Sequence, residues 1–239
     1  MLSRYKAFMS AGFELTIPAS GGAPGTPAYA NVPAGARRGV VVIHEIFGRQ
    51  PEIDRVVERF AAASYAAVAP DLFRQGKFAC LRDVFRLMKT GDGVTAQQGR
   101  NARAWLCQQA GLSPEHVGLI GFCFGGGFAL AAGAGWGAVS ANYAHLPSPK
   151  AMNGLGPVIA CYGSRDRTLQ SAPSQLRERL ASLGHADSEV HVFDAGHSFL
   201  TDGKPHLVQK IMPMGFGSYP EARDDAWTRI FAFFDRRLS

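Results

Sequence analysis

Apolar positions in this chain follow two different periods, and segments of the two kinds alternate along it. Continuous apolar runs, as at 39–43 and 158–162, are typical of strands that are buried on both faces of a sheet. Between 51 and 63 the apolar residues instead recur three or four positions apart, which predicts an amphipathic helix. The same reasoning predicts extended segments at 13–17, 29–32, 66–69, 117–120, 139–143 and 189–193, and helices at 96–109, 128–132, 174–183 and 221–238.

The order of these segments predicts the fold class. Strands that alternate with helices, without repeats or a long linker, are typical of an α/β protein with one mostly parallel, doubly wound sheet and helices on both of its faces. The Gly- and Pro-rich stretch 20–27 predicts a hairpin-like connection between the first two extended segments. A polar helical region precedes a break at 91–93, and 206–218 shows no clear period, so we expect a loop or short irregular helix there. We expect a single α/β domain over 1–239.

Charge and cysteine content limit the classes of partner. The 239 residues carry a net charge of +6, but no basic stripe or nucleic-acid module accompanies it, so we expect no nucleic-acid partner. A mild preference for anionic small molecules is the more useful inference. The four cysteines form no C-x-x-C pair, and we find neither a signal peptide nor an apolar run that could span a membrane. These features predict a cytoplasmic protein without a membrane partner, and the lack of heptads and of an obvious exposed apolar helix predicts a monomer.

One strand–turn–helix junction contains a candidate catalytic residue. An apolar strand runs into Gly121-Phe122-Cys123-Phe124-Gly125, and an alanine-rich helix follows. This is the setting of a nucleophile elbow, in which glycines let two backbones pass closely and the central side chain stands above the sheet. Cysteine is otherwise often a small buried apolar residue. The setting predicts instead that Cys123 is the nucleophile of a hydrolase with the α/β-hydrolase fold, and that the amide of Phe124 faces the same space.

A thiol nucleophile needs a base and a third group that orients the base. In α/β-hydrolases the acid and then the histidine follow the nucleophile along the chain. Asp166 and His197 each follow an extended segment in this order. We therefore predict a triad of Cys123, Asp166 and His197 at three consecutive strand ends, on the edge where open α/β sheets bind ligands. Asp194 is too close to His197 in sequence to serve as the acid and is expected to brace the turn.

The segment 42–48 reads Val-Ile-His-Glu-Ile-Phe-Gly and ends an early central strand. α/β-Hydrolases take their second oxyanion donor from this position, which here is the amide of Ile46. His44 and Glu45 begin like a zinc motif, but position 48 is not a histidine, so we expect no metal. Glu45 is expected to approach the Cys123 thiol and control when it ionises, the alternative being a solvated glutamate at a strand end. The other three cysteines, at 80, 107 and 161, are expected to be structural.

Five motifs that occur in order carry a resemblance to a known family. They are Val-Val-Ile-His-Glu-Ile-Phe-Gly at 41–48, Pro-Asp-Leu-Phe-Arg at 70–74, Gly-Phe-Cys-Phe-Gly-Gly at 121–126, Tyr-Gly-Ser-Arg-Asp at 162–166 and Ala-Gly-His-Ser-Phe at 195–199. Together they resemble the dienelactone hydrolase (carboxymethylenebutenolidase) family over residues 12–238. The resemblance implies the triad Cys123, Asp166 and His197, and a Glu45 that contacts the resting thiol and helps to deprotonate it when substrate binds. It also implies hydrolysis of an enol-lactone to a dicarboxylic acid through an acyl-enzyme, without a metal or organic cofactor.

Two departures from the family pattern concern the substrate. The family's basic residue after the His-Ser-Phe motif has no arginine counterpart, because residues 200–204 read Leu-Thr-Asp-Gly-Lys. The other family arginine matches Arg74 with a spacing that differs by one residue. The candidate pocket residues are Phe47, Phe73, Arg74, Tyr143 and Phe199.

Three readings remain open on these residues. The leading one is a hydrolase that cleaves a lactone or small ester through a thioester acyl-enzyme. A general carboxylesterase or a thiol acyltransferase could use the same triad, because the choice of acyl acceptor is a property of the pocket. A non-catalytic binding protein could also keep the fold with a vestigial site. The presence of all three triad residues and of Glu45 favours an enzyme whose partner is a small-molecule lactone or ester.

Overall fold

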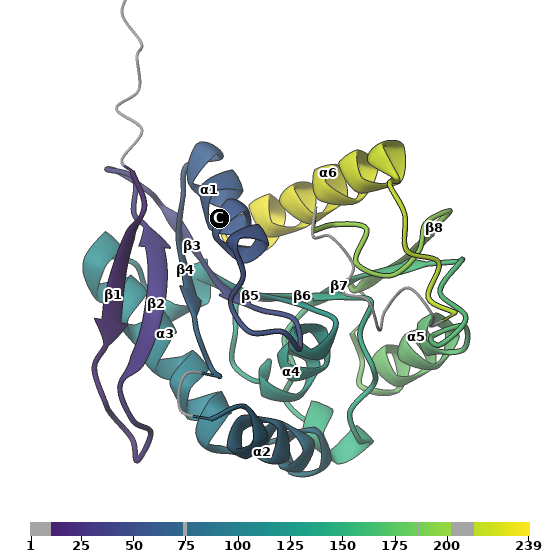
Figure 1. Ribbon diagram of the computed structural model, residues 1–239, viewed down its shortest axis with the longest axis horizontal. Helices are drawn as coiled ribbons and strands as arrows, with labels where there is room; N and C mark the ends of the chain where they lie inside the picture. Colours follow the sequence, from purple (N-terminus) through teal and green to yellow (C-terminus); the bar gives the residue numbers. More distant parts are fainter. Residues whose placement is uncertain (1–10, 74–75, 186, 202–212) are drawn as a thin grey trace, which may run out of the picture.

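The computed structural model describes residues 11–73, 76–185, 187–201 and 213–239. Its strands form one sheet in the order β1-β2-β4-β3-β5-β6-β7-β8 (Figure 1). β1 and β2 form an antiparallel hairpin, β2 pairs antiparallel with β4, and every later pairing is parallel. The expected mostly parallel sheet is therefore confirmed. The strands are β1 (Phe13–Ile17), β2 (Thr26–Asn31), β3 (Arg38–Ile43), β4 (Tyr65–Pro70), β5 (Val117–Phe122), β6 (Ala138–Asn142), β7 (Val158–Gly163) and β8 (Glu189–Phe193).

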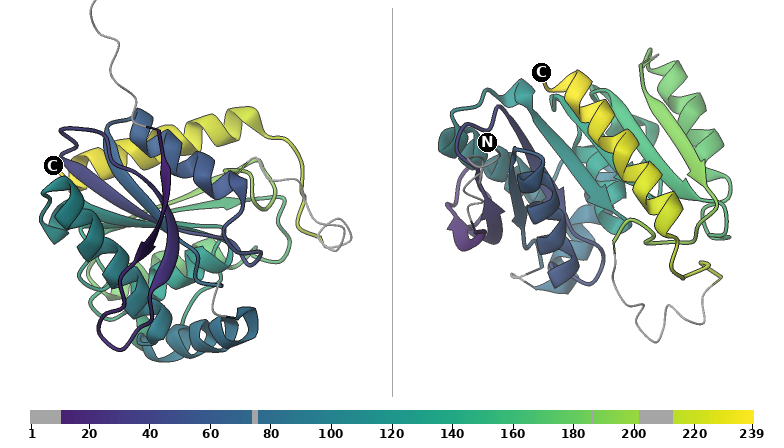
Figure 2. Two further views of the ribbon diagram at one scale, coloured as in Figure 1. Left: turned by 60° about the vertical axis from the view of Figure 1, so that its left-hand side comes forward. Right: turned by 90° about the horizontal axis from the view of Figure 1, so that it is seen from above.

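Helices cover both faces of this sheet, as the alternation of segments predicts. α1 (Pro51–Ala62) and α6 (Pro220–Arg237) lie on one face, above the sheet in Figure 1 and in front of it in the right-hand view of Figure 2. α3 (Val94–Ala110), α4 (Phe124–Ala132) and α5 (Ala172–Ser182) lie on the other face. Two short 3-10 helices, η1 (Pro114–His116) and η2 (Pro149–Met152), occupy connections.

The core between α1, α6 and the sheet is rich in aromatic rings. Phe60 of α1 is fully buried and lies 5.8 Å from the ring of Trp227 and 6.0 Å from that of Phe234, both on α6. Trp227 in turn reaches Phe122, the last residue of β5. Burial of side chains of this size contributes roughly 1.5–3 kcal/mol each. This packing holds the end of β5, and with it the elbow, against a rigid layer.

α2 (Lys77–Thr90) is the polar helical region that precedes the break at 91–93. It packs against α3, α4 and η2 and forms the lowest layer in Figure 1. Its inner face buries Cys80, Val84 and Leu87. Its outer face carries Phe78 and Phe85, which are 88% and 62% exposed. The expectation that no apolar helix face is exposed was therefore wrong.

One expectation about the strand order was also wrong. Asp166 and His197 follow neighbouring strands, β7 and β8, but β6 lies between β5 and β7. The triad thus spans four adjacent strand ends rather than three, and the residue that follows β6, Tyr143, enters the site. Of the segment 206–218, only 213–218 is described, and it is irregular without helix. Among the residues that the structure describes, no helix is long and apolar enough to cross a membrane.

Candidate active site

The candidate active site lies at the carboxyl edge of the parallel strands. Glu45 follows β3, Cys123 follows β5, Tyr143 follows β6, Asp166 follows β7 and His197 follows β8. Strands of a parallel sheet all end at one edge, so residues far apart in sequence converge there. The predicted nucleophile, acid, base and thiol-modulating residue therefore meet at one place.

The turn at Cys123 holds a strained conformation. Its φ of 55° lies in the left-handed region, where a non-glycine residue is uncommon. A Cβ on Gly121 would lie 1.9 Å from the carbonyl oxygen of Gly125, and one on Gly125 would lie 2.5 Å from that of Ile43. Both glycines are thus required for the close passage of β5, α4 and β3. The Cys123 N–H donates to the carbonyl oxygen of Asn142 at 3.0 Å, which fixes the elbow to β6.

Asp166 holds His197 in one orientation. Oδ2 of Asp166 lies 2.6 Å from Nδ1 of His197, and the two residues are 1% and 2% exposed. Oδ1 of the same carboxylate accepts hydrogen bonds from the N–H and hydroxyl of Thr168 at 2.9 and 2.5 Å. Burial opposes the charge on Asp166, but the hydrogen bonds from His197 and Thr168 lower its pKa. The carboxylate is therefore ionised and fixes the proton of His197 on Nδ1.

The other nitrogen of His197 points toward the elbow. Nε2 is buried and meets no partner at normal hydrogen-bond geometry among the described residues. The group that acts on its charge from that side is the Cys123 thiol. Although burial opposes charge on the ring, Asp166 and Cys123 together raise the pKa of His197 to about 10. Catalytic hydrogen bonds are often long before substrate binds, so a buried Nε2 that faces the elbow without a close partner is compatible with a catalytic base.

Part of the segment 206–218, which the sequence predicts to be a loop or short irregular helix, also supports His197. The N–H of His197 donates to the carbonyl oxygen of Met214 at 2.8 Å, and the ring of Phe216 meets the imidazole edge-on at 5.9 Å. A Cβ on Gly196 would lie 1.7 Å from the carbonyl oxygen of Gly215, so the two loops are in direct contact. Sequence analysis missed Phe216, because a contact made by an irregular loop has no periodicity.

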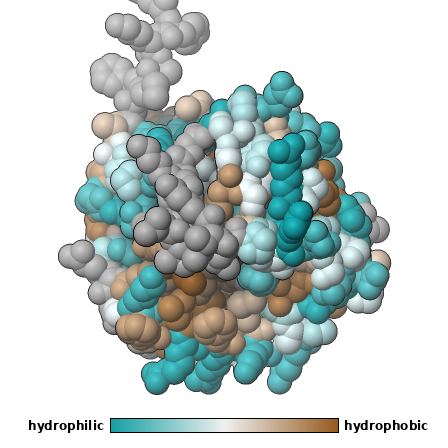
Figure 3. Space-filling view, turned by 45° about the vertical axis from the view of Figure 1, so that its right-hand side comes forward, coloured by the Kyte–Doolittle hydropathy of each residue, from teal (hydrophilic) through white to brown (hydrophobic). Residues whose placement is uncertain are grey.

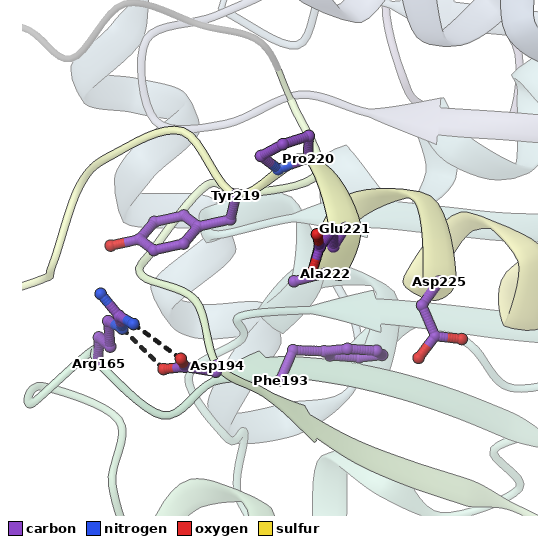
Figure 4. Close-up of a pocket in the computed structure, with 8 residues that line it drawn as sticks. All are labelled: Arg165, Phe193, Asp194, Tyr219, Pro220, Glu221, Ala222 and Asp225. Atoms are coloured by element: carbon purple, nitrogen blue, oxygen red, sulfur yellow. Dashed lines mark hydrogen bonds and ion pairs between the residues drawn. The ribbon is translucent and has the colours of Figure 1, made fainter.

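Asp194 lies outside this hydrogen-bond chain. Its carboxylate forms a bidentate ion pair with Arg165, with both N–O distances 2.7 Å (Figure 4). The Arg165 guanidinium also lies over the ring of Tyr219, 5.3 Å from its centroid, and both residues line a surface cavity with Phe193 and the start of α6. The pair links the loops after β7 and β8, which is the bracing position predicted for Asp194.

Glu45 lies in a polar cluster beside the triad. Its Oε1 accepts hydrogen bonds from Thr201 at 3.1 Å and from the hydroxyl of Tyr143 at 3.4 Å. The Tyr143 ring is buried and packs on the His197 imidazole with 4.8 Å between centroids. Burial raises the pKa of Glu45, against the effects of His197 and of hydrogen bonds from Ser198, Thr201 and Tyr143. Glu45 is therefore not a freely solvated glutamate, and Thr201 is a further residue that sequence analysis missed.

The backbone amides of Phe124 and Ile46, the predicted oxyanion donors, belong to turns beside the elbow. Phe124 is the first residue of α4, and the N–H groups of a first helical turn have no acceptor within the helix. Ile46 lies in the turn after β3, which is closed by the Gly48 N–H and the Glu45 carbonyl oxygen at 3.1 Å. Because α4 packs on the end of β3, both positions border the elbow.

His44 has a structural role beside the site. Its Nε2 accepts a hydrogen bond from the Leu72 N–H at 3.1 Å, and its Nδ1 lies 2.7 Å from the Glu45 carbonyl oxygen. Burial lowers the pKa of His44, so the ring is neutral and has no free lone pair for a metal. The described residues contain no group of three or more His, Cys, Asp or Glu that could hold a metal ion.

Comparison with known proteins identifies the family. The model of the Dienelactone hydrolase family matches residues 26–238. The chain belongs to the dienelactone hydrolase family. A carboxymethylenebutenolidase from Rhodococcus opacus is 27% identical over an alignment that covers 88% of this chain and 86% of the relative.

The fold of a solved structure agrees with this family. A dienelactone hydrolase-like promiscuous phosphotriesterase from metagenomic libraries superimposes with a TM-score of 0.77, and the match covers 96% of this chain and 100% of that one. At 21% identity this likeness shows the α/β-hydrolase fold alone. The family and its relatives place the chain among the dienelactone hydrolase-like carboxylic ester hydrolases.

The structure separates the pocket candidates into two groups. Phe47 and Phe73 are partly exposed, and Nζ of Lys77 lies 5.8 Å from the centroid of each ring. Tyr143 and Phe199 are buried and pack against each other, and Tyr143 also packs on the His197 ring. Arg74, the family-matched cation, lies outside the described residues, as do residues 202–212. Lys77, missed by sequence analysis, is therefore the cation that the structure places beside Phe47 and Phe73.

Proposed function

We propose that this chain is a cysteine-dependent hydrolase that cleaves an enol-lactone or a small ester through a thioester acyl-enzyme. One observation carries the proposal: His197 is held by Asp166 on Nδ1 and turns its other nitrogen toward Cys123 at a nucleophile elbow. This arrangement supplies a nucleophile, a base and an orienting acid in the order that thiol catalysis needs.

In the first half-reaction, the Cys123 sulfur attacks the carbonyl carbon of the substrate. His197 holds the thiol proton on Nε2, and the carbonyl oxygen becomes an oxyanion that accepts hydrogen bonds from the amides of Phe124 and Ile46. The carbon–oxygen bond to the leaving group then breaks, and His197 returns its proton to that oxygen, so that the imidazole is neutral again for the second half-reaction. In a lactone the leaving oxygen stays in the same molecule, so the thioester carries a ring-opened chain.

In the second half-reaction, water hydrolyses the thioester. His197 accepts a proton from the water, whose oxygen attacks the acyl carbon, and the oxyanion again lies at the same two amides. Collapse breaks the carbon–sulfur bond, releases a carboxylic acid and restores the Cys123 thiol. For an enol-lactone the oxygen that leaves in the first half-reaction departs as an enolate before it takes the proton of His197. An enolate is a weaker base than an alkoxide, which makes ring opening easier.

Glu45 has a separate role in this scheme. Its carboxylate shares a cluster with Tyr143 and Thr201 and lies close enough to the triad to affect the charge on His197. A second negative charge beside Cys123 disfavours the thiolate, so the ionisation of the nucleophile depends on the state of Glu45. We propose that substrate binding changes this environment and releases the thiolate for attack.

The other cysteines are poor alternatives to Cys123. Burial raises the pKa of Cys80 to about 12, and it also raises the pKa values of Cys107 and Cys161. These three residues are therefore thiols at neutral pH, and thiols are weak nucleophiles. Cys123, by contrast, is partly exposed and has a histidine beside it.

The test compares turnover of a dienelactone and of p-nitrophenyl acetate by wild-type protein and two variants. Cys123→Ala should lose turnover by at least about 1000-fold, because the covalent route is closed. Cys107→Ala, the matched control, should change the rate by less than about threefold. Mass spectrometry of protein quenched during turnover should find the acyl group on Cys123. Turnover that persists in Cys123→Ala, or an acyl group on another residue, would refute the proposal.

The same assay distinguishes the reaction classes. A general carboxylesterase would hydrolyse p-nitrophenyl acetate and leave the dienelactone unchanged. A thiol acyltransferase would form a new ester, amide or thioester when an alcohol, amine or thiol acceptor is added to the mixture. Hydrolysis of the lactone without transfer to these acceptors is the outcome that the proposal expects.

A further inference from the structure

The outer face of α2 combines protruding rings with positive charge. Phe78 and Phe85 are 88% and 62% exposed, and they are seven positions apart, so they project from the same side of the helix. Leu81, between them along the chain, is partly buried, and Val94 at the start of α3 is 47% exposed. Isolated exposed apolar residues are ordinary, but an exposed helical stripe of phenylalanines calls for an explanation. We call Phe78, Leu81 and Phe85 the α2 stripe.

A basic row lies next to the α2 stripe. At about 100° per residue, Arg82, Arg86 and Lys89 lie within one quarter-turn of Phe78, on the side opposite Leu81. All three are exposed, and none forms an ion pair with another described residue. This part of α2 is thus apolar along one edge and cationic along the other.

The only acidic residue of α2 does not offset this charge. Asp83 points toward the start of α3, where its carboxylate accepts hydrogen bonds from the N–H of Val94 at 3.2 Å and from the N–H and hydroxyl of Thr95 at 2.7 and 2.6 Å. Its negative charge is therefore engaged by the first turn of α3 and does not neutralise the basic row. The surface that α2 offers to a partner is cationic.

We propose that α2 docks this protein on anionic lipid surfaces. A helix that lies in the plane of a membrane interface buries its phenyl and leucyl side chains at the boundary of headgroups and acyl chains, while its Lys and Arg residues bind anionic headgroups. The α2 stripe and the basic row match this division. Figure 3 shows a hydrophobic area in the lower part of the molecule, at the level of α2, with hydrophilic side chains along its lower border.

The charge argues against a second copy as the partner. Symmetric dimers bring the same patch of both subunits together, so Arg82, Arg86 and Lys89 would face their own counterparts. Like charges in contact disfavour such an interface. An anionic lipid surface offers acyl chains to the α2 stripe and negative headgroups to the basic row. A second copy of the same cationic face does not offer the negative charge.

Docking through α2 would also place the candidate active site near the lipid. The first residue of α2 is Lys77, whose Nζ lies above the rings of Phe47 and Phe73. Phe73 in turn contacts the ring of Phe124, next to the elbow, at 5.6 Å. The surface proposed for lipid therefore borders the mouth of the site, where an ester dissolved in the lipid would be within reach.

The test is co-sedimentation of the full-length protein with vesicles. Wild-type protein should bind vesicles that contain both phosphatidylcholine and phosphatidylglycerol. Its affinity for vesicles of phosphatidylcholine alone should be at least tenfold lower. The double variant Phe78→Ser, Phe85→Ser should bind the anionic vesicles at least tenfold more weakly. The triple variant Arg82→Gln, Arg86→Gln, Lys89→Gln should lose at least as much affinity. The matched control is Phe13→Ser with Val192→Ser, which removes two exposed apolar residues elsewhere and should bind like the wild type. Thermal unfolding verifies that each variant is folded.

Four outcomes would overturn the proposal. They are no binding to the anionic vesicles, equal loss in the control variant, unchanged binding in both α2 variants, and a dimer in solution that Phe78→Ser with Phe85→Ser converts to a monomer. Preferential binding of a single-stranded oligonucleotide that excludes the vesicles would assign the surface to nucleic acid instead. None of these measurements depends on ester hydrolysis, so the proposal can fail or succeed independently of the enzyme activity.

Discussion

The Oδ2 atom of Asp166 lies 2.6 Å from Nδ1 of His197, and both side chains are almost completely removed from solvent. The loops that carry them follow β7 and β8, and the ion pair of Arg165 with Asp194 links the same two loops at the surface. One pair is buried and orients the base, whereas the other is exposed and braces the backbone. Replacement of Asp166 should therefore lower kcat much more than replacement of Asp194.

Replacement of Asp166 by asparagine should lower kcat by at least about 100-fold at neutral pH, because the amide no longer fixes the proton of His197 on Nδ1 or favours its charged form. Replacement of Asp194 by asparagine is the control. That pair is exposed and its charges are screened by solvent, so kcat should change by less than about threefold. Steady-state kinetics on p-nitrophenyl acetate measure both. Equal losses in the two variants would contradict the assignment of the acid.

The charged form of His197 should make stability depend on pH. Its pKa is raised in the folded protein from 6.5 to about 10, so its contribution is fully present below about pH 6.5 and is lost as the pH rises through 10. The difference in free energy of unfolding between wild type and His197→Gln should therefore shrink between pH 6.5 and 10. Urea titrations at both pH values measure it. A difference that stays constant would show that His197 is not charged in the folded state.

The strained backbone at Cys123 should lower the free energy of unfolding of the protein. Glycine adopts a φ of 55° without the steric penalty of a Cβ atom, so Cys123→Gly should raise the free energy of unfolding by about 1 kcal/mol while it abolishes turnover. Cys123→Ala keeps the Cβ and should leave stability nearly unchanged. Thermal or urea unfolding of the two variants compares them. If glycine and alanine have the same effect, the elbow is not strained.

Local pattern was enough to predict the strands and the triad. The apolar runs before Cys123 and Asp166 are strands because side chains buried on both faces of a parallel sheet leave no polar position. β8, which precedes His197, is the edge strand and alternates polar with apolar residues. The turn residues after each run then placed the candidate chemistry at the sheet edge. Spatial order is not contained in this pattern, so nothing in the periodicity indicated that β6 separates β5 from β7 and brings in Tyr143.

Contacts between loops could not be predicted from the sequence either, because they too depend on spatial arrangement and not on periodicity. Thr201 reaches Glu45 across 156 positions, and Phe216 meets His197 from a segment without a period. The buried face of α2 was difficult to predict for a different reason, because apolar residues occur on both sides of the helix. Cys80, Val84 and Leu87 face inward and the α2 stripe faces outward, and the sequence alone does not say which set is buried.

The cluster around Glu45 leads to the last prediction, which concerns the reactivity of the Cys123 thiol. An ionised carboxylate beside the site disfavours the thiolate, so Glu45→Gln should be alkylated by iodoacetamide about three- to tenfold faster at pH 7. Burial raises the pKa of Glu45, so wild-type alkylation should also show a step on the acid side, where Glu45 gains its proton and the repulsion ends. That step should be absent in Glu45→Gln.

Glu221→Gln is the matched control for this measurement, because Glu221 is exposed at the start of α6 and lies outside the cluster. Its alkylation rate and pH profile should match those of the wild type. Peptide mass spectrometry after timed quenching follows Cys123 separately from Cys80, Cys107 and Cys161. Thr201→Val, which removes one hydrogen bond to Oε1 and keeps the charge, should raise the pKa of Glu45 further and shift the step to higher pH. Identical profiles in wild type and Glu45→Gln would remove Glu45 from the control of the nucleophile and leave His197 as the only group that sets its ionisation.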